Sequence, residues 1–272
     1  GDFVLQNDRA KFFIATDDRS VSPCPYGGNP VDAQLRHPDG SFGDDIFGEI
    51  CPMFNVGQSF RPTSFEVLRD GASSGTGVLR VTGEVEVLDF LNLDAMAPPE
   101  VEPFLDRIPF DPNTPPPLTV TVYYVLNQGA RHLRIVTAVR NDGSEAVHAT
   151  YGHLIKSGGS GSYFNPLNGP GGFGYDSLGT DNIEGFPTPF VAYRGETASY
   201  TYVPDADPQL GDDLPTGGVQ VSISGVTVTM LGRENLAETL LKTEQDFERA
   251  HGILHLDPGE STSRASRYYV GD

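Results

Sequence analysis

The chain has 272 residues, of which 38% are hydrophobic, and a formal net charge of −19 from 37 acidic and 18 basic residues. This charge argues against nucleic acid and anionic membrane surfaces as partners, because both require clustered Lys and Arg. No run of about 20 apolar residues is present, so we expect no membrane span.

Alternating hydrophobicity predicts antiparallel strands along most of the chain. The clearest predicted strand covers 118–126, with Leu118, Val120 and Val122 on one face. It is followed by short Asn/Gly turns and two further strands, which together form a meander. One helix is predicted over 234–249, between an acidic first turn and a C-terminal Gly. The predicted strands cover 3–6, 10–16, 78–88, 118–126, 132–140, 146–155, 219–223, 226–230, 253–256 and 264–270.

Two segments interrupt this alternation. The first, 94–117, contains eight prolines and therefore cannot be a central strand. The second, 156–189, is rich in Gly, Pro, Asn and Tyr, and long loops of this kind are often functional. We expect one all-β domain over 1–272, a large antiparallel two-sheet sandwich with at most one short helix. Since the chain starts on a strand, without Met or a signal peptide, we expect a processed or excised part of a longer protein.

The two cysteines, Cys24 and Cys51, are each adjacent to proline. A disulfide between them would close a loop of the chain and would thereby stabilise the fold by about 3 kcal/mol in the chain-entropy model. The alternative is two separate buried thiols. The disulfide and the acidic composition favour an oxidising location: secreted, periplasmic or at the cell surface.

The first candidate site lies close to these cysteines, in segments 26–32, 44–50 and 54–55. It combines the planar hydrogen-bonding groups and the aromatic ring that sugar sites use. The alternative is a structured loop in which Asn and Asp cap turns. The candidate ligand-binding residues here are Tyr26, Asn29, Asp32 and Asn55.

The second candidate site contains His153, with Tyr151 and Lys156 as candidate ligand-binding residues, before a long Gly-rich loop. His153 could act as a general acid or base together with a carboxylate such as Glu49 or Asp176. The alternative is a structural or surface histidine. The spread of the other five histidines, His37, His132, His148, His251 and His255, does not indicate a metal cluster.

The third candidate is the acidic segment 205–213, in which Asp205, Asp207 and Asp212 offer hard oxygen ligands for Ca²⁺. Its spacing differs from that of an EF-hand loop, and the alternative is a solvated acidic loop. The sequence lacks a nucleophile elbow, a P-loop, a zincin motif and a dinucleotide fingerprint. It also lacks Trp, the commonest stacking platform of carbohydrate-binding modules.

Several short motifs resemble the front domain of large exported bacterial proteins, some of which continue into a PHP-type metal-dependent hydrolase domain. The resemblance implies a β-supersandwich like that of galactose mutarotases and polysaccharide lyases. It also implies an accessory role, since the metal-binding His and Asp motifs of the hydrolase part are not found in this chain. The motifs are Val4-Leu5-Gln6-Asn7-Asp8-Arg9-Ala10-Lys11-Phe12, Tyr26-Gly27-Gly28-Asn29-Pro30-Val31-Asp32-Ala33, Phe47-Gly48-Glu49, Phe54-Asn55, Arg131-His132-Leu133-Arg134-Ile135-Val136-Thr137, Val139-Arg140-Asn141-Asp142-Gly143, the loop from Gly158-Gly159 to Gly172-Phe173-Gly174, and Leu256-Asp257-Pro258-Gly259-Glu260-Ser261.

Three hypotheses follow. The leading one is a non-catalytic accessory domain that binds a glycan or packs against a neighbouring hydrolase domain of the same polypeptide. The second is an epimerase or lyase that uses His153 and a carboxylate. The third is a purely structural interaction module, which an exposed apolar patch would favour.

Overall fold

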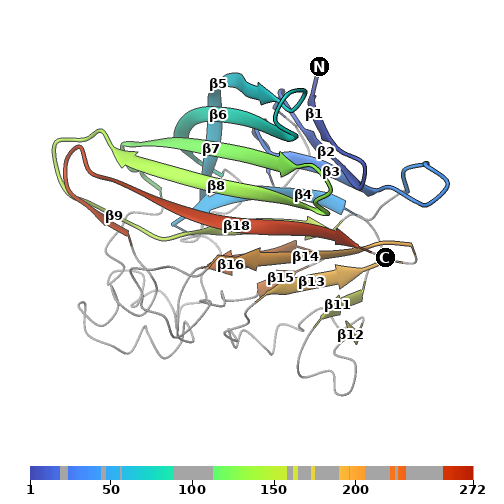
Figure 1. The fold of residues 1–272 in the computed structure, drawn as a ribbon. Helices are drawn as coiled ribbons and strands as arrows, with labels where there is room; N and C mark the ends of the chain where they lie inside the picture. Colours follow the sequence, from blue (N-terminus) through green and yellow to red (C-terminus); the bar gives the residue numbers. More distant parts are fainter. Residues whose placement is uncertain are drawn as a thin grey trace.

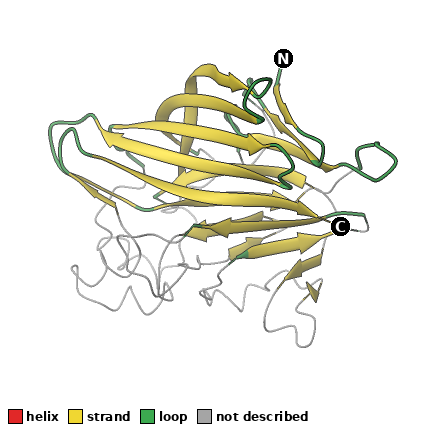
Figure 2. Ribbon diagram, in the orientation of Figure 1, coloured by secondary structure: helices red, strands yellow, loops and turns green. Residues whose placement is uncertain are grey.

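The computed structural model describes residues 1–18, 24–43, 47–55, 57–88, 113–157, 162–164, 173–174, 190–195, 197–205, 221–223, 226–230 and 254–271. Every regular element in these ranges is a β-strand (Figure 2). Within them no helix has the length and hydrophobicity needed to cross a membrane. The all-β prediction is confirmed, and the helix predicted over 234–249 lies outside the described residues.

A single antiparallel sheet of 13 described strands dominates the molecule (Figure 1). Its strand order is β12-β11-β13-β14-β18-β8-β7-β6-β5-β4-β10-β16-β15. The strands are β4 (Phe47–Phe54), β5 (Gln58–Asp70), β6 (Thr76–Val87), β7 (Leu118–Asn127), β8 (His132–Asn141), β10 (Tyr151–Ser157), β11 (Ser162–Phe164), β12 (Phe173–Gly174), β13 (Val191–Arg194), β14 (Ser199–Pro204), β15 (Val221–Ile223), β16 (Val226–Met230) and β18 (Ser261–Gly271).

Two smaller antiparallel sheets accompany it. One has the order β1-β2-β3, and the other pairs β17 with β9. Their bounds are β1 (Phe3–Gln6), β2 (Ala10–Ile14), β3 (Pro30–Leu35), β9 (Val147–Ala149) and β17 (Leu254–Leu256).

The large sheet curls until strands near its two ends face each other. The ring of Phe47 on β4 lies 5.1 Å from Tyr268 on β18 and 5.9 Å from Tyr200 on β14, although these strands are far apart in the sheet order. The Tyr200 hydroxyl also donates to the carbonyl of Ala33 on β3, 3.0 Å away. The two layers expected from the sequence are therefore the two ends of one continuous sheet, with the β1–β3 sheet packed against them.

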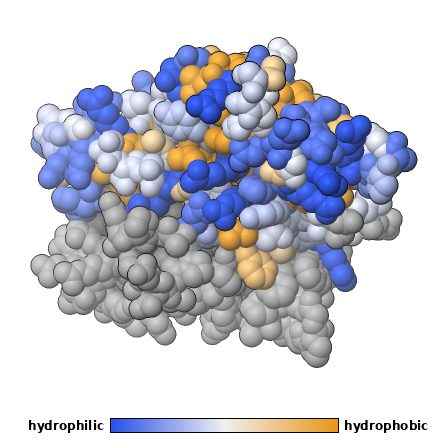
Figure 3. Space-filling view, viewed as in Figure 1, coloured by the Kyte–Doolittle hydropathy of each residue, from blue (hydrophilic) through white to orange (hydrophobic). Residues whose placement is uncertain are grey.

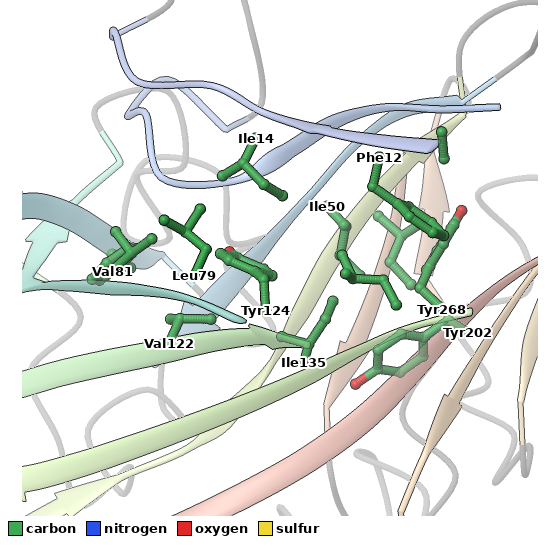
Figure 4. Packing of buried hydrophobic residues seen from close by; sticks show 14 of the residues in the cluster. Phe12, Ile14, Ile50, Leu79, Val81, Val122, Tyr124, Ile135, Tyr202 and Tyr268 are labelled. Carbon is green, nitrogen blue, oxygen red and sulfur yellow. The ribbon is translucent and has the colours of Figure 1, made fainter. Parts of the chain in front are cut away.

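The hydrophobic core fills the space inside this curl (Figure 4). In β7 the burial of side chains alternates regularly, with the predicted apolar residues inward, and in β8 Leu133, Ile135 and Val139 are buried as predicted. This period of two arises because one face of the meander meets the core while the other meets water. Core residues labelled in Figure 4 are Phe12, Ile14, Ile50, Leu79, Val81, Val122, Tyr124, Ile135, Tyr202 and Tyr268.

Two sequence-based expectations are corrected. Residues 47–54, which were not predicted as a strand, form β4, which is buried on both faces and therefore lacks alternating hydrophobicity. The strand predicted over 146–155 is two strands, β9 and β10, which join different sheets. The chain changes sheet at Thr150, whose amide donates to Asn55 Oδ1 at 2.9 Å.

Candidate functional site

His153 lies in the interior, with its imidazole between two tyrosine hydroxyls. Its Nδ1 is 2.7 Å from the hydroxyl of Tyr202 on β14, and its Nε2 is 3.2 Å from that of Tyr151. Only 1% of His153 is exposed, and burial lowers its pKa to about 3. The ring is therefore neutral at physiological pH, and both of its nitrogens interact with protein hydroxyls.

Tyr151 belongs to the same buried cluster. Burial raises its pKa well above the ordinary value, and the neighbouring Tyr202 raises it further. The phenol therefore stays protonated and acts as a hydrogen-bonding group. The structure brings Tyr151 and His153 together, as the sequence suggested, in a cluster that is closed to solvent.

Glu49 lies on the opposite face of the sheet from His153. In the pairing of β4 with β10, Glu49 is opposite Lys156, three positions from His153. Because successive side chains alternate between the two faces of a strand, this odd offset separates Glu49 from His153. The Glu49 carboxylate is 2% exposed and lies 3.8 Å from Lys156 Nζ. The structure therefore does not bring His153 and Glu49 together.

The predicted disulfide between Cys24 and Cys51 is present, with Cα atoms 5.9 Å apart. It packs with Met53 and Leu154 in a small buried cluster, separate from the main core. The bond ties the segment before β3 to the centre of β4. These contacts cover the second face of β4.

Tyr26 and Asn29 make contacts within the N-terminal part of the fold. The Tyr26 hydroxyl donates to the carbonyl of Val87 at 2.8 Å, and the Arg61 guanidinium lies 5.4 Å from its ring centre. Asn29 is 1% exposed, and its Nδ2 donates to the carbonyls of Tyr26 and Gly27 at 2.9 and 3.2 Å. The amide of Asn29 thus closes the turn that leads into β3.

Asp32 and Asn55 lie apart from this turn. Asp32 Oδ2 accepts a hydrogen bond from Gln34 on the same strand, at 3.0 Å. Asn55 is buried with φ at +47°, and its Nδ2 donates to Gln58 Oε1 at 3.0 Å. The side chains of these four candidate residues therefore each have a hydrogen-bond partner within the fold, and those of Asn29 and Asn55 are buried.

Asp205 contacts two arginines. Its carboxylate lies 3.1 Å from Arg267 and 3.7 Å from Arg134, on neighbouring strands. The other residues of the predicted calcium loop, Asp207 and Asp212, lie outside the described residues, as does Asp176. The described part of this segment thus uses its carboxylate for ion pairs.

An open cleft of about 910 Å³ lies between β1 and the β5–β6 hairpin. Its lining comes from β1 and the turn after it, from both strands and the turn of the hairpin, and from the end of β7. Polar groups such as Asp8, Arg69 and Gln128 surround an apolar floor that includes Leu79 and Leu126. β1 pairs only with β2 among the described strands, so its outer edge is unpaired there.

All the large hydrophobic side chains that are exposed in the described part of the chain lie at this cleft or directly beside it. They are Val4, Val67 and Leu68, with exposed fractions of 51%, 53% and 41%. Figure 3 shows hydrophobic surface gathered at the end of the molecule where β1 and the β5–β6 hairpin lie in Figure 1. Sequence reasoning missed this cleft, because β5 was not predicted; its signal was the apolar group Phe65, Val67 and Leu68 within a polar run.

A scan of protein-family models and a search of curated proteins gave no match. Solved structures do resemble the chain. A glycosyl hydrolase family 38 protein from Enterococcus faecalis has a TM-score of 0.50 at 11% identity, over 98% of this chain and 30% of that one. A TPR-domain containing protein from Parabacteroides distasonis has a TM-score of 0.50 at 11% identity, over 99% and 46%.

A galactose mutarotase related enzyme from Lactobacillus acidophilus has a TM-score of 0.48 at 10% identity, over 100% of this chain and 98% of that one. At these identities the likeness concerns the fold alone. The chain spans less than half the length of the Enterococcus and Parabacteroides proteins. The fold is an all-β, curled antiparallel sheet, and galactose mutarotase-like proteins are among its structural neighbours.

Proposed function

We propose that this chain is a non-catalytic accessory domain of an exported bacterial protein. In this proposal the cleft between β1 and the β5–β6 hairpin packs against a neighbouring domain of the same polypeptide, of the hydrolase type that the sequence resemblance implies. The observation that carries the proposal is the gathering of Val4, Val67 and Leu68 at one place. Exposed apolar side chains that cluster on an otherwise polar surface are typical of interaction sites.

The occurrence of this fold inside longer chains supports an accessory role. The Enterococcus and Parabacteroides structures contain it as 30% and 46% of their length. An inter-domain surface in such chains buries part of each domain, with a mixture of apolar and polar contacts. The apolar floor and polar rim of the cleft have this composition.

The position of the candidate catalytic residues supports a non-catalytic role. A general acid or base must come within hydrogen-bonding distance of its substrate. His153 is 1% exposed, and both of its ring nitrogens contact tyrosine hydroxyls. Glu49 lies on the other face of the sheet. The disulfide between Cys24 and Cys51 fits the proposed export, because disulfides persist in oxidising compartments.

The test compares this chain with the complete polypeptide from which it derives, by hydroxyl-radical footprinting. We expect labelling of Val4, Val67 and Leu68 to fall in the complete polypeptide. A Val67→Asp/Leu68→Asp variant should lower the Tm of the complete polypeptide more than that of the isolated chain. Ser64→Asp, also exposed on β5, is the matched control and should affect both equally. Equal labelling in the two proteins would contradict the proposal.

The polar rim of the cleft favours a second candidate function, the binding of a glycan. Carboxylate, amide and guanidinium groups in this rim are hydrogen-bonding partners for sugar hydroxyls. A glycan at 100 times its Kd would stabilise the chain by about 2.7 kcal/mol, which a thermal-shift screen of mono- and oligosaccharides detects. A shift that Arg69→Ala abolishes would establish the glycan as ligand; no shift with any sugar would remove this candidate.

A further inference from the structure

Two histidines that are 107 positions apart in the sequence lie directly opposite each other at the small β9–β17 sheet. The antiparallel pairing sets His255 against His148. Nδ1 of His255 is 3.2 Å from Nε2 of His148, and the two rings meet edge to face, with an angle of 81° between their planes. The backbone register itself therefore brings the two imidazoles together.

This spacing suits the chelation of one metal ion. Imidazole nitrogens bind Zn²⁺ at about 2.0–2.1 Å. Two nitrogens 3.2 Å apart, each at that distance from one ion, subtend an angle of about 100° at the metal, between the octahedral and tetrahedral values. The distance between the two nitrogens therefore suits a single ion that replaces the proton now shared between the rings.

Asp257 supports this arrangement from the far side of His255. Its Oδ1 lies 3.7 Å from His255 Nε2. This is an ion-pair distance and not a hydrogen bond; a small side-chain rotation that closes it would place the proton on Nε2 and leave the lone pair of Nδ1 on the side of His148. The turn that holds Asp257 is fixed by two hydrogen bonds: Asp257 N donates to Glu260 Oε2, and Glu260 N donates to Asp257 O, both at 2.9 Å.

The pair of His148 and His255 is open to solvent, since 53% of the His255 side chain is exposed. Within the described residues no third His, Cys, Asp or Glu joins the pair, so water would fill the remaining coordination positions. Imidazole ligands favour Zn²⁺, Ni²⁺ and Cu²⁺ over Ca²⁺ and Mg²⁺. We propose that His148 and His255 form an open binding site for a divalent transition-metal ion, with Asp257 as the outer partner that orients His255.

The test is calorimetric titration of the chelator-treated, dialysed protein with ZnCl₂ and with NiCl₂. We expect one ion per chain. His148→Ala and His255→Ala should each weaken binding at least tenfold, and Asp257→Asn about tenfold, as expected for the loss of an outer-shell partner. His132→Ala is the control, because this imidazole packs against Tyr269 elsewhere in the fold, and it should leave the Kd unchanged.

A second measurement separates loss of the site from loss of the fold. Zn²⁺ should shift the imidazole NMR signals of His148 and His255 in the unmodified protein and leave those of His132 in place. Absence of both binding heat and shifts at millimolar Zn²⁺ would show that the two rings form only a hydrogen-bonded pair. Binding that survives in both alanine variants would place the ion elsewhere; either result overturns the proposal.

Discussion

His153 Nδ1 and the Tyr202 hydroxyl lie 2.7 Å apart and connect two strands, β10 and β14, that are distant in the sheet order. Their hydrogen bond crosses the interior of the curl, next to the contact of the Tyr151 hydroxyl with His153 Nε2. A buried polar pair of this kind restricts which strands can face each other, because any other arrangement leaves polar groups without partners. We therefore interpret the cluster around His153 as a determinant of the curl.

The burial of His153 makes stability depend on pH. Its pKa is about 3 in the folded protein, below the ordinary value of 6.5. As the pH falls, the unfolded chain therefore takes up the proton before the folded protein does. The free energy of unfolding keeps its full contribution from His153 above pH 6.5 and loses it as the pH falls toward 3. Between pH 7.5 and 5 the loss amounts to about 2 kcal/mol. Urea unfolding at the two pH values measures it.

The variant His153→Gln isolates this effect. It keeps a polar side chain but cannot take up the proton, so its unfolding free energy should fall by about 2 kcal/mol less over the same pH interval. Carboxylates that contribute to acid sensitivity are the same in both proteins and cancel in the difference. Identical pH dependence in the two proteins would mean that His153 is not buried as a neutral ring.

Removal of the Tyr202 hydroxyl should destabilise the fold. Tyr202→Phe keeps the ring but leaves His153 Nδ1 without its partner in a buried place, at a cost of about 1–3 kcal/mol. Tyr123→Phe, on a half-buried residue of β7, is the control and should change stability by less than about 0.5 kcal/mol. Urea unfolding gives the free energies of unfolding of the two variants. Equal losses would mean that the hydrogen bond between Tyr202 and His153 does not stabilise the fold.

The strands that sequence analysis identified have one face on the core and one in water. β7 and β8 are such strands, and their period of two is visible in the sequence. β4 was missed because the main core covers one face and the disulfide cluster covers the other. The outer half of β5 was missed for the opposite reason, since most of its side chains are exposed on both faces.

Side-chain partners could be predicted less well than strands. The sequence pointed to His153 but could not show that it is buried, because the curl decides which distant strand faces β10. It gave no reason to connect His148 with His255, whose contact depends on the register of two short strands far apart in the chain. The disulfide was predictable, because only one pairing of the two cysteines exists.

Loss of the disulfide should lower the free energy of unfolding by about 3 kcal/mol, because the unfolded chain regains the conformational entropy of the loop that the bond closes. The measurement is urea unfolding of the protein with and without reductant. In a Cys24→Ser/Cys51→Ser variant, reductant should have no effect. If reductant lowers the stability of this variant equally, the stabilisation does not come from the disulfide.

Asn55 should be more sensitive to alanine than to glycine. Its φ of +47° lies in the left-handed region, and its side chain bonds Gln58 and the amide of Thr150. Both substitutions remove these buried hydrogen bonds, but only alanine adds the steric cost of a Cβ at positive φ, about 1–2 kcal/mol. Urea unfolding of the pair should therefore show Asn55→Ala less stable than Asn55→Gly by that amount. Equal stabilities would mean that the chain relaxes at this turn, and the connection between β4 and β5 would then depend on its side-chain hydrogen bonds alone.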